Sequence, residues 1–241
     1  MKTVVIGDIH GRSVWKLITH MEKPDRVIFV GDYFDSYDIS TAEQVKNFKE
    51  IIKYKEDNPQ IETIILIGNH CIHYFPEMGG DNGTSGFQYK MYYTISNEVD
   101  KNRHHLQMAY QFNDYLFTHA GVSSEFMDSA FKDGWSVDNI ANDLNDLFKY
   151  KLRSFLFPPS ALDPYGDDTY QTPIWIRPRS LMLANKDTLR DKVIQIVGHT
   201  SVSKIYIKGT STGGRYYFID CLDRVNEYLI IEENKLSVGK I

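Results

Sequence analysis

Short apolar runs rich in β-branched residues recur along the first third of the chain, and helical patterns separate them. The runs are TVVIG at residues 3–7, RVIFVG at 26–31 and TIILIG at 63–68. The intervening stretches predict helices near 13–21 and 41–56. The pattern therefore predicts a strand, helix, strand, helix, strand order, which is typical of an α/β protein.

The pattern changes in the middle of the chain. HLQMAYQF and YLFTHAG are separated by Asn113 and Asp114, a polar two-residue turn that predicts a hairpin. Apolar residues at helical spacing predict an amphipathic helix within 136–155. Residues 155–179 hold five of the eight prolines, which favours an extended surface segment.

Strand patterns return near the end of the chain, at VIQIVG (193–198), KIYIKG (204–209), RYYFID (215–220) and EYLIIEE (227–233). Together with the hairpin they predict a mixed rather than a purely parallel sheet. A chain of 241 residues is long enough for one sizeable core. We therefore expect a single α/β domain over residues 1–241.

Composition and charge narrow the possible partners. Hydrophobic residues make up 42% and charged residues 24%, which is ordinary for a folded protein. The net charge is -5 and the basic residues are scattered, so we do not expect a long nucleic acid as partner. Two cysteines are too few for a disulfide framework, and the N-terminus resembles neither a signal peptide nor a membrane span. These features predict a cytoplasmic protein without a membrane partner.

Each apolar run ends on side chains that can bind a metal ion. The first ends in Asp8 and His10, the second in Asp32 and Asp35, the third in Asn69 and His70. The hairpin strand ends in His119 and the run at 193–198 in His199. Strand carboxyl ends in open α/β sheets face a common crevice, so these residues are expected to converge.

The residue types indicate which ions this cluster would bind. Carboxylate, amide and imidazole donors together suit borderline ions such as manganese, iron or zinc better than calcium or magnesium. Six ligands are also more than one tetrahedral ion needs. The set is Asp8, His10, Asp32, Asn69, His119 and His199.

Five motifs in a fixed order resemble those of the calcineurin-like metallophosphoesterase superfamily: GDIHG, GDYFD, GNH, HAG and GHT. The GHTS form of the last motif resembles the serine/threonine-phosphatase-type branch with its bacterial and phage relatives. The resemblance implies a metallophosphoesterase-type sandwich of mixed β-sheets flanked by helices. It also implies a two-metal phosphoesterase that works by direct attack of a metal-bound hydroxide, without a phosphoenzyme.

The resemblance also implies roles for individual residues. Asp8 and His10 would hold a first ion, Asp32 would bridge two ions, and the second would be completed by Asn69, His119 and His199. His70 would be the catalytic acid and Asp35 its orienting partner. We expect manganese as the most effective ion, with iron, zinc and nickel as alternatives.

The chain departs from the family pattern on the substrate side. Ser36 stands where the family usually has a phosphate-binding arginine, Cys71 replaces the acidic residue after GNH, and the late Asp-Thr-Gly element is Asp220-Cys221-Leu222. Arg177, in a tryptophan-x-arginine element similar to that of bacterial relatives, is the nearest replacement for the arginine. Arg179 and Arg12 are weaker alternatives.

Three functions remain open at this point. The first is a phosphomonoesterase acting on phosphoprotein or a small phosphorylated metabolite. The second is a phosphodiester or diadenosine tetraphosphate-type hydrolase. The tyrosines in an irregular segment after GNH support this function. The third is a non-catalytic scaffold. Loss of His70 or of a metal ligand would favour this function, and neither is lost. His20, His73, His104 and His105 have no comparable context and are expected to be exposed or locally hydrogen-bonded.

Overall fold

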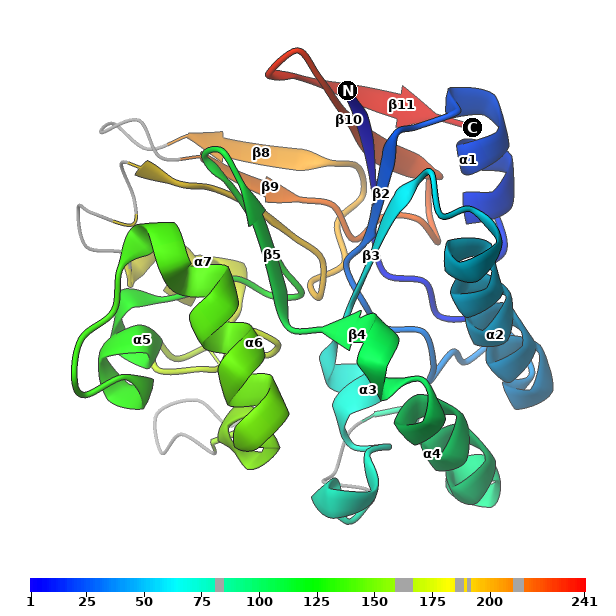
Figure 1. The fold of residues 1–241 in the computed structure, drawn as a ribbon, viewed down its shortest axis with the longest axis horizontal. Coiled ribbons are helices and arrows are strands. Elements are labelled where there is room, and N and C mark those ends of the chain that lie inside the picture. Colours follow the sequence, from blue (N-terminus) through cyan, green and yellow to red (C-terminus); the bar gives the residue numbers. More distant parts are fainter. Residues whose placement is uncertain (81–84, 159–166, 185–188, 190–191, 210–214) are drawn as a thin grey trace.

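The computed structural model describes residues 1–80, 85–158, 167–184, 189, 192–209 and 215–241. In this part of the chain the strands form two sheets, with the orders β11-β10-β1-β2-β3-β4 and β5-β6-β7-β9-β8 (Figure 1). The first sheet contains β1 (Lys2–Ile6), β2 (Arg26–Phe29), β3 (Glu62–Leu66), β4 (Leu106–Gln107), β10 (Glu227–Glu232) and β11 (Lys235–Lys240). The second contains β5 (Ala109–Phe112), β6 (Tyr115–Thr118), β7 (Ile194–Val197), β8 (Tyr206–Gly209) and β9 (Arg215–Phe218).

Both sheets are mixed, as the sequence predicts. Strands β1 to β4 are parallel, whereas β10 pairs antiparallel with β1 and β11 antiparallel with β10. In the second sheet β6, β7 and β9 are parallel, while β5 and β8 are antiparallel edge strands. The predicted hairpin is confirmed as β5 and β6, and β11 was not expected from the sequence.

The parallel strands of the first sheet are apolar on both faces, which explains why their runs are continuous rather than alternating. On β2, Val27 and Phe29 pack toward the helices, whereas Ile28 and, directly after the strand, Val30 face the second sheet. Ile65 and Leu66 on β3 divide in the same way. The face between the sheets is completed by residues of the second sheet such as Phe117 and Ile196. The molecule is therefore a sandwich of two sheets.

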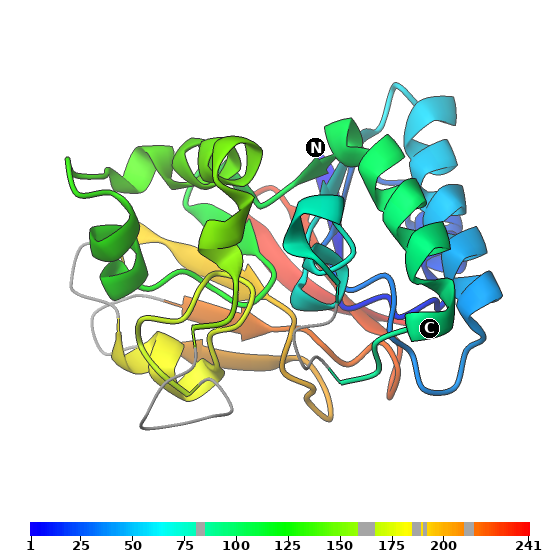
Figure 2. The same cartoon turned by 90° about the horizontal axis from the view of Figure 1, so that it is seen from below.

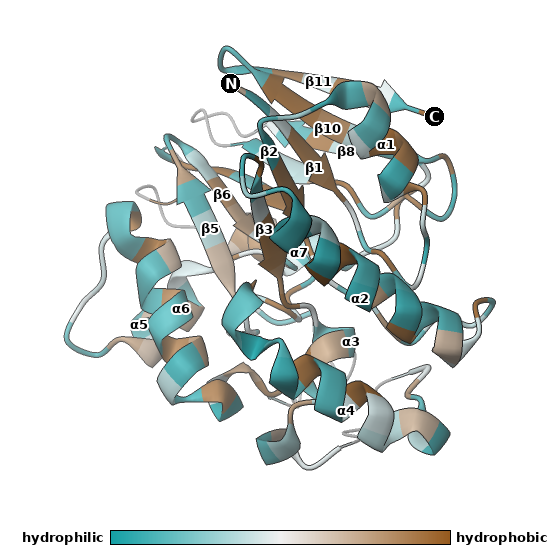
Figure 3. Ribbon diagram, turned by 45° about the vertical axis from the view of Figure 1, so that its right-hand side comes forward, coloured by the Kyte–Doolittle hydropathy of each residue, from teal (hydrophilic) through white to brown (hydrophobic). Residues whose placement is uncertain are grey.

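Helices cover the outer faces of this sandwich (Figures 1 and 2). Helices α1 (Trp15–Glu22), α2 (Thr41–Asp57) and α4 (Tyr92–Lys101) lie beside the first sheet, and α5 (Ser124–Ala130), α6 (Ile140–Tyr150) and α7 (Pro178–Leu183) beside the second. In Figure 3 strands β1 and β3 are brown, and much of α2 is teal. Helix α2 begins with a capping box of Ser40 and Glu43. The short elements are α3 (Asn69–Ile72), η1 (Pro76–Met78), η2 (Tyr89–Met91), η3 (Arg103–His105), η4 (Val137–Asn139) and η5 (Leu152–Phe155).

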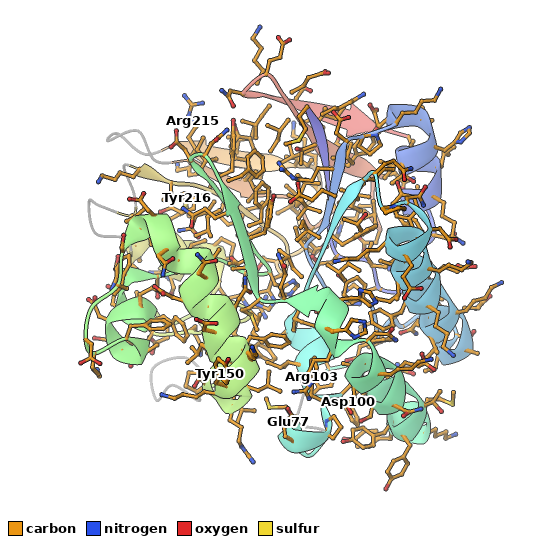
Figure 4. The ribbon with its side chains drawn as sticks, in the orientation of Figure 1. Glu77, Asp100, Arg103, Tyr150, Arg215 and Tyr216 are labelled. Atoms are coloured by element: carbon orange, nitrogen blue, oxygen red, sulfur yellow. The ribbon has the colours of Figure 1, made fainter. Side chains whose placement is uncertain are left out.

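An ion cluster fastens the chain that follows α3 to helix α4. Arg103 lies beside Glu77 and Asp100 in Figure 4, with Nη1 at 2.5 Å from Glu77 Oε1 and Nη2 at 3.1 Å from Asp100 Oδ1. The same guanidinium lies 4.6 Å from the ring centroid of Phe75. This cluster anchors the short helical turn Pro76–Met78, which follows the turn that carries His70.

Three expectations about local structure need correction. The predicted helix within 136–155 is divided into η4, α6 and η5. The tyrosine-rich segment after GNH is not irregular throughout, because Tyr92–Lys101 forms α4. The proline-rich segment lies only partly at the surface where it is described, since Gln171, Ile174 and Ile176 are fully buried while Tyr170 and Arg179 are exposed. Apolar residues packed under the second sheet override the local proline signal.

Most of the glycine-rich loop 208–215 lies outside the described residues. Among the residues that are described, no helix combines the length and apolarity that crossing a membrane requires.

Candidate metal centre

The carboxyl ends of four parallel strands and the start of α3 bring the predicted ligands together. Asp8 follows β1, Asp32 follows β2 and His119 follows β6. Their ligand atoms all lie within 4.8 Å of one another, and the three side chains are almost completely buried. Because buried charges are stable only when they are paired or bind a metal, this triad is the centre of the candidate site.

Asn69 links His199 to this triad. Its Oδ1 lies 2.9 Å from His119 Nε2 and 2.9 Å from His199 Nδ1. His119 Nε2 is also 3.2 Å from Asp32 Oδ2, and His10 Nε2 is 3.8 Å from the same oxygen. The six residues predicted from the sequence thus form one continuous cluster.

Each histidine of the cluster has one ring nitrogen on a backbone carbonyl and the other directed at the cluster. His10 Nδ1 lies 2.6 Å from the carbonyl oxygen of Phe34, and His119 Nδ1 lies 2.9 Å from that of Val30. His199 uses Nε2, at 3.1 Å from the carbonyl oxygen of Trp175. A carbonyl oxygen can only accept a hydrogen bond, so the ring nitrogen beside it carries the proton. In a neutral ring the other nitrogen, which faces the cluster, keeps its lone pair. This is the arrangement that metal-binding histidines have.

Two glycines allow the backbone to approach the carboxylates. A Cβ atom on Gly68 would lie 2.1 Å from Asp32 Oδ1, and one on Gly198 would lie 1.9 Å from Asp8 Oδ1. Any side chain at either position would displace a ligand. The apolar runs therefore end in glycine because the following loop passes directly over a carboxylate.

Several site residues have left-handed backbone conformations, which cost free energy in residues with a side chain. The φ angles are 40° at His10, 49° at Asp32, 64° at Asp35 and 65° at His199. These angles turn each side chain out of the strand direction and toward the cluster. Such strain is retained only where the surrounding structure imposes it.

Electrostatics in the cluster favour a cation. Burial and the charges of Asp220 and Asp32 raise the pKa of Asp8. Burial, together with Asp32 and Asp223, raises the pKa of Asp220 to about 6. Carboxylates packed this closely destabilise one another, and a divalent ion offsets that repulsion. The residues present therefore fit a metal ion in charge as well as in donor type.

Burial favours the neutral form of two ligand histidines, His10 and His199. Burial, reinforced by the charges of Arg177 and His119, lowers the pKa of His199. Burial also lowers the pKa of His10. For Asp32 burial raises the pKa, but the charges of His119 and His70 outweigh it and the pKa lies below its ordinary value. Neutral imidazole and ionised carboxylate are the forms that bind metal.

His70 and Asp35 form a pair beside the cluster. His70 Nδ1 lies 3.0 Å from Asp35 Oδ2, and the backbone N–H of His70 donates to Asp32 Oδ1 at 2.9 Å. Burial lowers the pKa of His70, but Asp32 and Asp35 raise it above the ordinary value. His70 lines a cavity of about 210 Å³ together with Asp8 and His10, so its ring faces the same space as the ligands.

The three arginines named from the sequence lie in different surroundings. Arg177 Nη1 donates to Thr200 Oγ1 at 3.3 Å, and its charge lowers the pKa of both His70 and His199. Arg12 lines the cavity and donates to Asp38 at 3.3 Å. Arg179 is 81% exposed and lies 3.8 Å from Asp167. The structure thus brings Arg177 and Arg12 to the site but not Arg179.

The departures from the family pattern have structural explanations. Ser36 lines the cavity and donates from Oγ to Asp38 Oδ1 at 2.6 Å. Cys71 is buried, its Sγ accepts the N–H of Tyr33 at 3.3 Å, and burial raises its pKa. Cys71 is therefore a packed thiol rather than a reactive one.

Two residues at the site were missed from the sequence. His73, expected to be exposed or locally bonded, is only 1% exposed and has Nε2 at 3.0 Å from Asp35 Oδ2. Tyr74 is fully buried and donates from its hydroxyl to Asp35 Oδ1 at 2.5 Å. The three-residue spacing between His70 and His73, which places both on one side of a helical turn, was the available signal.

Comparisons with known proteins agree with this geometry. Residues 1–226 match the family model of the calcineurin-like phosphoesterases. No curated protein sequence matches the chain. Three solved structures, each less than 20% identical to this chain, show the same fold.

The first of these structures is a cold-active protein-tyrosine phosphatase from a psychrophilic Shewanella species. Its TM-score is 0.65 at 18% identity, over 99% of this chain and 77% of that one. The second is a protein serine/threonine phosphatase from Saccharomyces cerevisiae, with a TM-score of 0.60 at 15% identity, over 100% and 79%. The third is a metallophosphoesterase from Sphaerobacter thermophilus, with 0.52 at 13%, over 100% and 88%. At these identities the likeness concerns the fold alone.

Proposed function

The chain belongs to the calcineurin-like phosphoesterase family, and from this premise we propose that it is a two-metal phosphomonoesterase acting on phosphoprotein or a small phosphorylated metabolite. Membership of the family makes it a metal-dependent hydrolase of phosphate esters. The observation that carries the finer proposal is the position of His70, which faces the same cavity as Asp8 and His10 and is held by Asp35.

The ligands divide into two groups that share Asp32. Asp8, His10 and Asp32 would hold one ion, and Asp32, Asn69, His119 and His199 the other. When bound, such ions supply positive charge to the phosphate oxygens and lower the pKa of the attacking water. Mixed nitrogen and oxygen donors favour manganese, with iron, zinc and nickel as alternatives. We expect up to two ions per chain.

The chain's own residues handle the leaving group and the phosphate. His70 would donate the proton on Nε2 to the departing oxygen, while its Nδ1–H stays on Asp35. Arg177 would contact the phosphate, because a guanidinium meets two phosphate oxygens at once and this one already lies within reach of His70 and His199. No covalent intermediate is needed.

A second candidate is a hydrolase of dinucleoside polyphosphates or phosphodiesters. Tyr37 lines the cavity beside Ser85 and is 80% exposed, so its ring is free to stack on a nucleobase. The tyrosines that first suggested this function do not support it equally, because Tyr74 is fully buried. Phosphomonoester hydrolysis remains the leading proposal, since it requires no further binding surface.

We also propose a cytoplasmic location. The support is that both cysteines, Cys71 and Cys221, are free and buried, as in proteins of a reducing compartment.

A panel of phosphomonoesters, phosphodiesters and dinucleoside polyphosphates tests the function. The protein is stripped with a chelator and assayed after addition of manganese, nickel, zinc or magnesium. We expect monoester hydrolysis that the chelator abolishes and manganese restores best. Absence of bound metal by elemental analysis, together with no metal-dependent thermal shift, overturns the proposal. Faster hydrolysis of dinucleoside polyphosphates, lost in Tyr37→Ala through a raised KM, replaces it with the second candidate.

A further inference from the structure

Asp35 accepts more hydrogen bonds than orienting His70 requires. Its Oδ2 lies 3.0 Å from His70 Nδ1 and 3.0 Å from His73 Nε2, and its Oδ1 accepts the hydroxyl of Tyr74 at 2.5 Å. Burial raises the pKa of Asp35, but its interactions with His70 and His73 outweigh burial and the pKa lies below its ordinary value. Asp35 is therefore an ionised carboxylate that is hydrogen-bonded to His70 and Tyr74 and has the His73 ring in close polar contact.

Local geometry explains why all three donors reach one carboxylate. Helix α3 is a single turn, and residues three apart on it face the same side, which directs both His70 and His73 at Asp35. Asp35 itself has a left-handed backbone, with φ at 64°. Tyr74 follows His73 directly in the chain, and its hydroxyl donates to the other carboxylate oxygen of Asp35, Oδ1.

Aromatic packing fixes the two additional donors and keeps water away. The rings of Tyr74 and Phe87 are stacked with centroids 5.0 Å apart, and His73 and Phe87 meet edge to face at 4.9 Å. The backbone N–H of Gln88 donates to the hydroxyl of Tyr74 at 2.8 Å. A Cβ on Gly86 would lie 2.7 Å from the carbonyl oxygen of Asp35. Residues 86–88 thus cover Asp35 closely.

We propose that His73 and Tyr74 are positioning residues for the reaction: together they fix the Asp35 carboxylate so that His70 Nε2 faces the leaving oxygen. This inference rests on the proposed function. A carboxylate held by one histidine alone rotates and takes the ring with it, whereas donors on both oxygens remove that freedom. His73 and Tyr74 keep their own protons, and only the His70 proton is transferred. Small misplacements of an acid are costly, because proton transfer needs hydrogen-bond distance.

The test uses three variants and two matched controls. Tyr74→Phe removes the hydroxyl donor, His73→Leu removes the imidazole donor, and His73→Gln keeps an N–H at a similar position. Tyr228→Phe is the first control, since its buried hydroxyl donates to Glu22 Oε1 at 2.6 Å away from the site. His105→Gln is the second, since His105 Nε2 lies 3.3 Å from Glu56 Oε1.

Each protein is loaded with manganese and assayed on an alkyl phosphate and on 4-nitrophenyl phosphate. Tyr74→Phe and His73→Leu act on the reaction only through Asp35 and His70, so each should lower kcat on the alkyl ester by less than the loss of a full charged hydrogen bond would, roughly 5-fold to 30-fold. We expect a change of about 2-fold or less on the nitrophenyl ester, whose leaving group needs no proton. KM and metal content should not change, His73→Gln should recover most of the rate, and both controls should match the wild type.

Non-additivity provides the second readout. In a His70→Asn background, Tyr74→Phe should have no further effect on the alkyl ester, because the acid that it positions is absent. Equal losses on both esters, or a further loss in the His70→Asn background, overturn the inference in favour of a structural role. Full activity of Tyr74→Phe on the alkyl ester overturns it as well, even if His73→Leu does not fold. The proposed function fails separately, if the wild type hydrolyses no phosphomonoester or His70→Asn is fully active.

Discussion

The metal ligands and the charged side chains outside them are held in place by different means. We call Asp8, His10, Asp32, Asn69, His119 and His199 the ligand floor, and the more exposed Arg12, Asp38, Arg177 and Arg179 the rim. Of the rim residues Arg12 and Asp38 line the cavity, whereas Arg179 lies away from it beside Asp167. Floor residues such as Asp32 and His119 are almost fully buried, and their histidines are tied to backbone carbonyls. On the rim, Asp38 is 69% and Arg179 81% exposed, and their partners are other side chains rather than backbone carbonyls.

The difference teaches where the family pattern is free to change. An exposed ion pair contributes about 1 kcal/mol or less, so the rim can exchange one cation for another at little cost to folding. A buried ligand cannot be exchanged, because its removal leaves other charges uncompensated. The following predictions rank the two regions by the size of the expected effects.

Removal of a floor carboxylate should have the largest effect. Asp32→Ala should abolish binding of at least one ion and lower kcat by about 10³-fold or more, since metal ions supply several kcal/mol to the transition state. Elemental analysis and kinetics on the loaded protein measure both quantities. Asp57→Asn, which alters an exposed carboxylate paired with Lys53, is the control. Retention of a full metal complement in Asp32→Ala would contradict the assignment.

Removal of the acid should rank second. His70→Asn should lower kcat on alkyl phosphates by about 10²-fold to 10⁴-fold and much less on nitrophenyl phosphate. Metal content should stay unchanged, because His70 contributes its backbone N–H rather than its ring to Asp32. Equal losses on both substrates would mean that His70 does not protonate the leaving group.

The rim should show smaller and separable effects. Arg177→Ala should lower kcat/KM by about 10-fold to 150-fold, which corresponds to roughly 1.5 to 3 kcal/mol for a charged hydrogen bond. Arg177→Lys should recover only part, because an ammonium cannot meet two oxygens as a guanidinium does. Arg179→Ala is the matched control and should be silent. If Arg177→Ala is silent while Arg12→Ala abolishes activity, the phosphate contact lies on the other side of the cavity.

The pH dependence of stability should give the smallest effect, and it concerns the protein without metal. The pKa of Asp220 is about 6 in the fold against 3.8 ordinarily, so the folded state binds more protons between these values and stability falls as pH rises through them. Asp220→Asn removes this loss. A difference of about 2 pKa units corresponds to about 3 kcal/mol, which solvent screening at the partly exposed Asp220 reduces, so the variant should stabilise the metal-free protein at pH 7 by about 2 kcal/mol.

Thermal unfolding at pH 4 and pH 7 checks the sign. The variant should match the wild type at pH 4 and melt higher at pH 7, and added manganese should remove the difference. Asp38→Asn is the rim control, because the hydrogen bond from Ser36 and the charge of Arg12 lower the pKa of that carboxyl and its removal gives no gain. Equal stabilisation at both pH values would show that the charge of Asp220 is not the cause.

Much of the fold was predictable because the strands are apolar on both faces and end in recognisable residues. The runs at 3–7, 26–31 and 63–68 became β1, β2 and β3, and the hairpin across Asn113 and Asp114 was confirmed. Local patterns failed where tertiary packing overrode them. The turns at Val137–Asn139 and Leu152–Phe155 replace the two ends of the predicted helix. Helix α4 lies in the tyrosine-rich segment, where the sequence predicted irregular structure.

The sequence alone determined which side chains can bind a metal, which glycines adjoin them and which strand each of them follows. Distance, burial and partners depended on the sandwich. Asp35 lies 38 residues from His73, and only the packing of α3 against the loop after β2 brings them to 3.0 Å. Likewise, nothing local distinguishes Arg177 from Arg179. Arg177 donates to Thr200, the neighbour of His199, whereas Arg179 lies in solvent, because α7 packs against the second sheet. Covalent sequence determines the donors, whereas long-range packing decides which of them share one site.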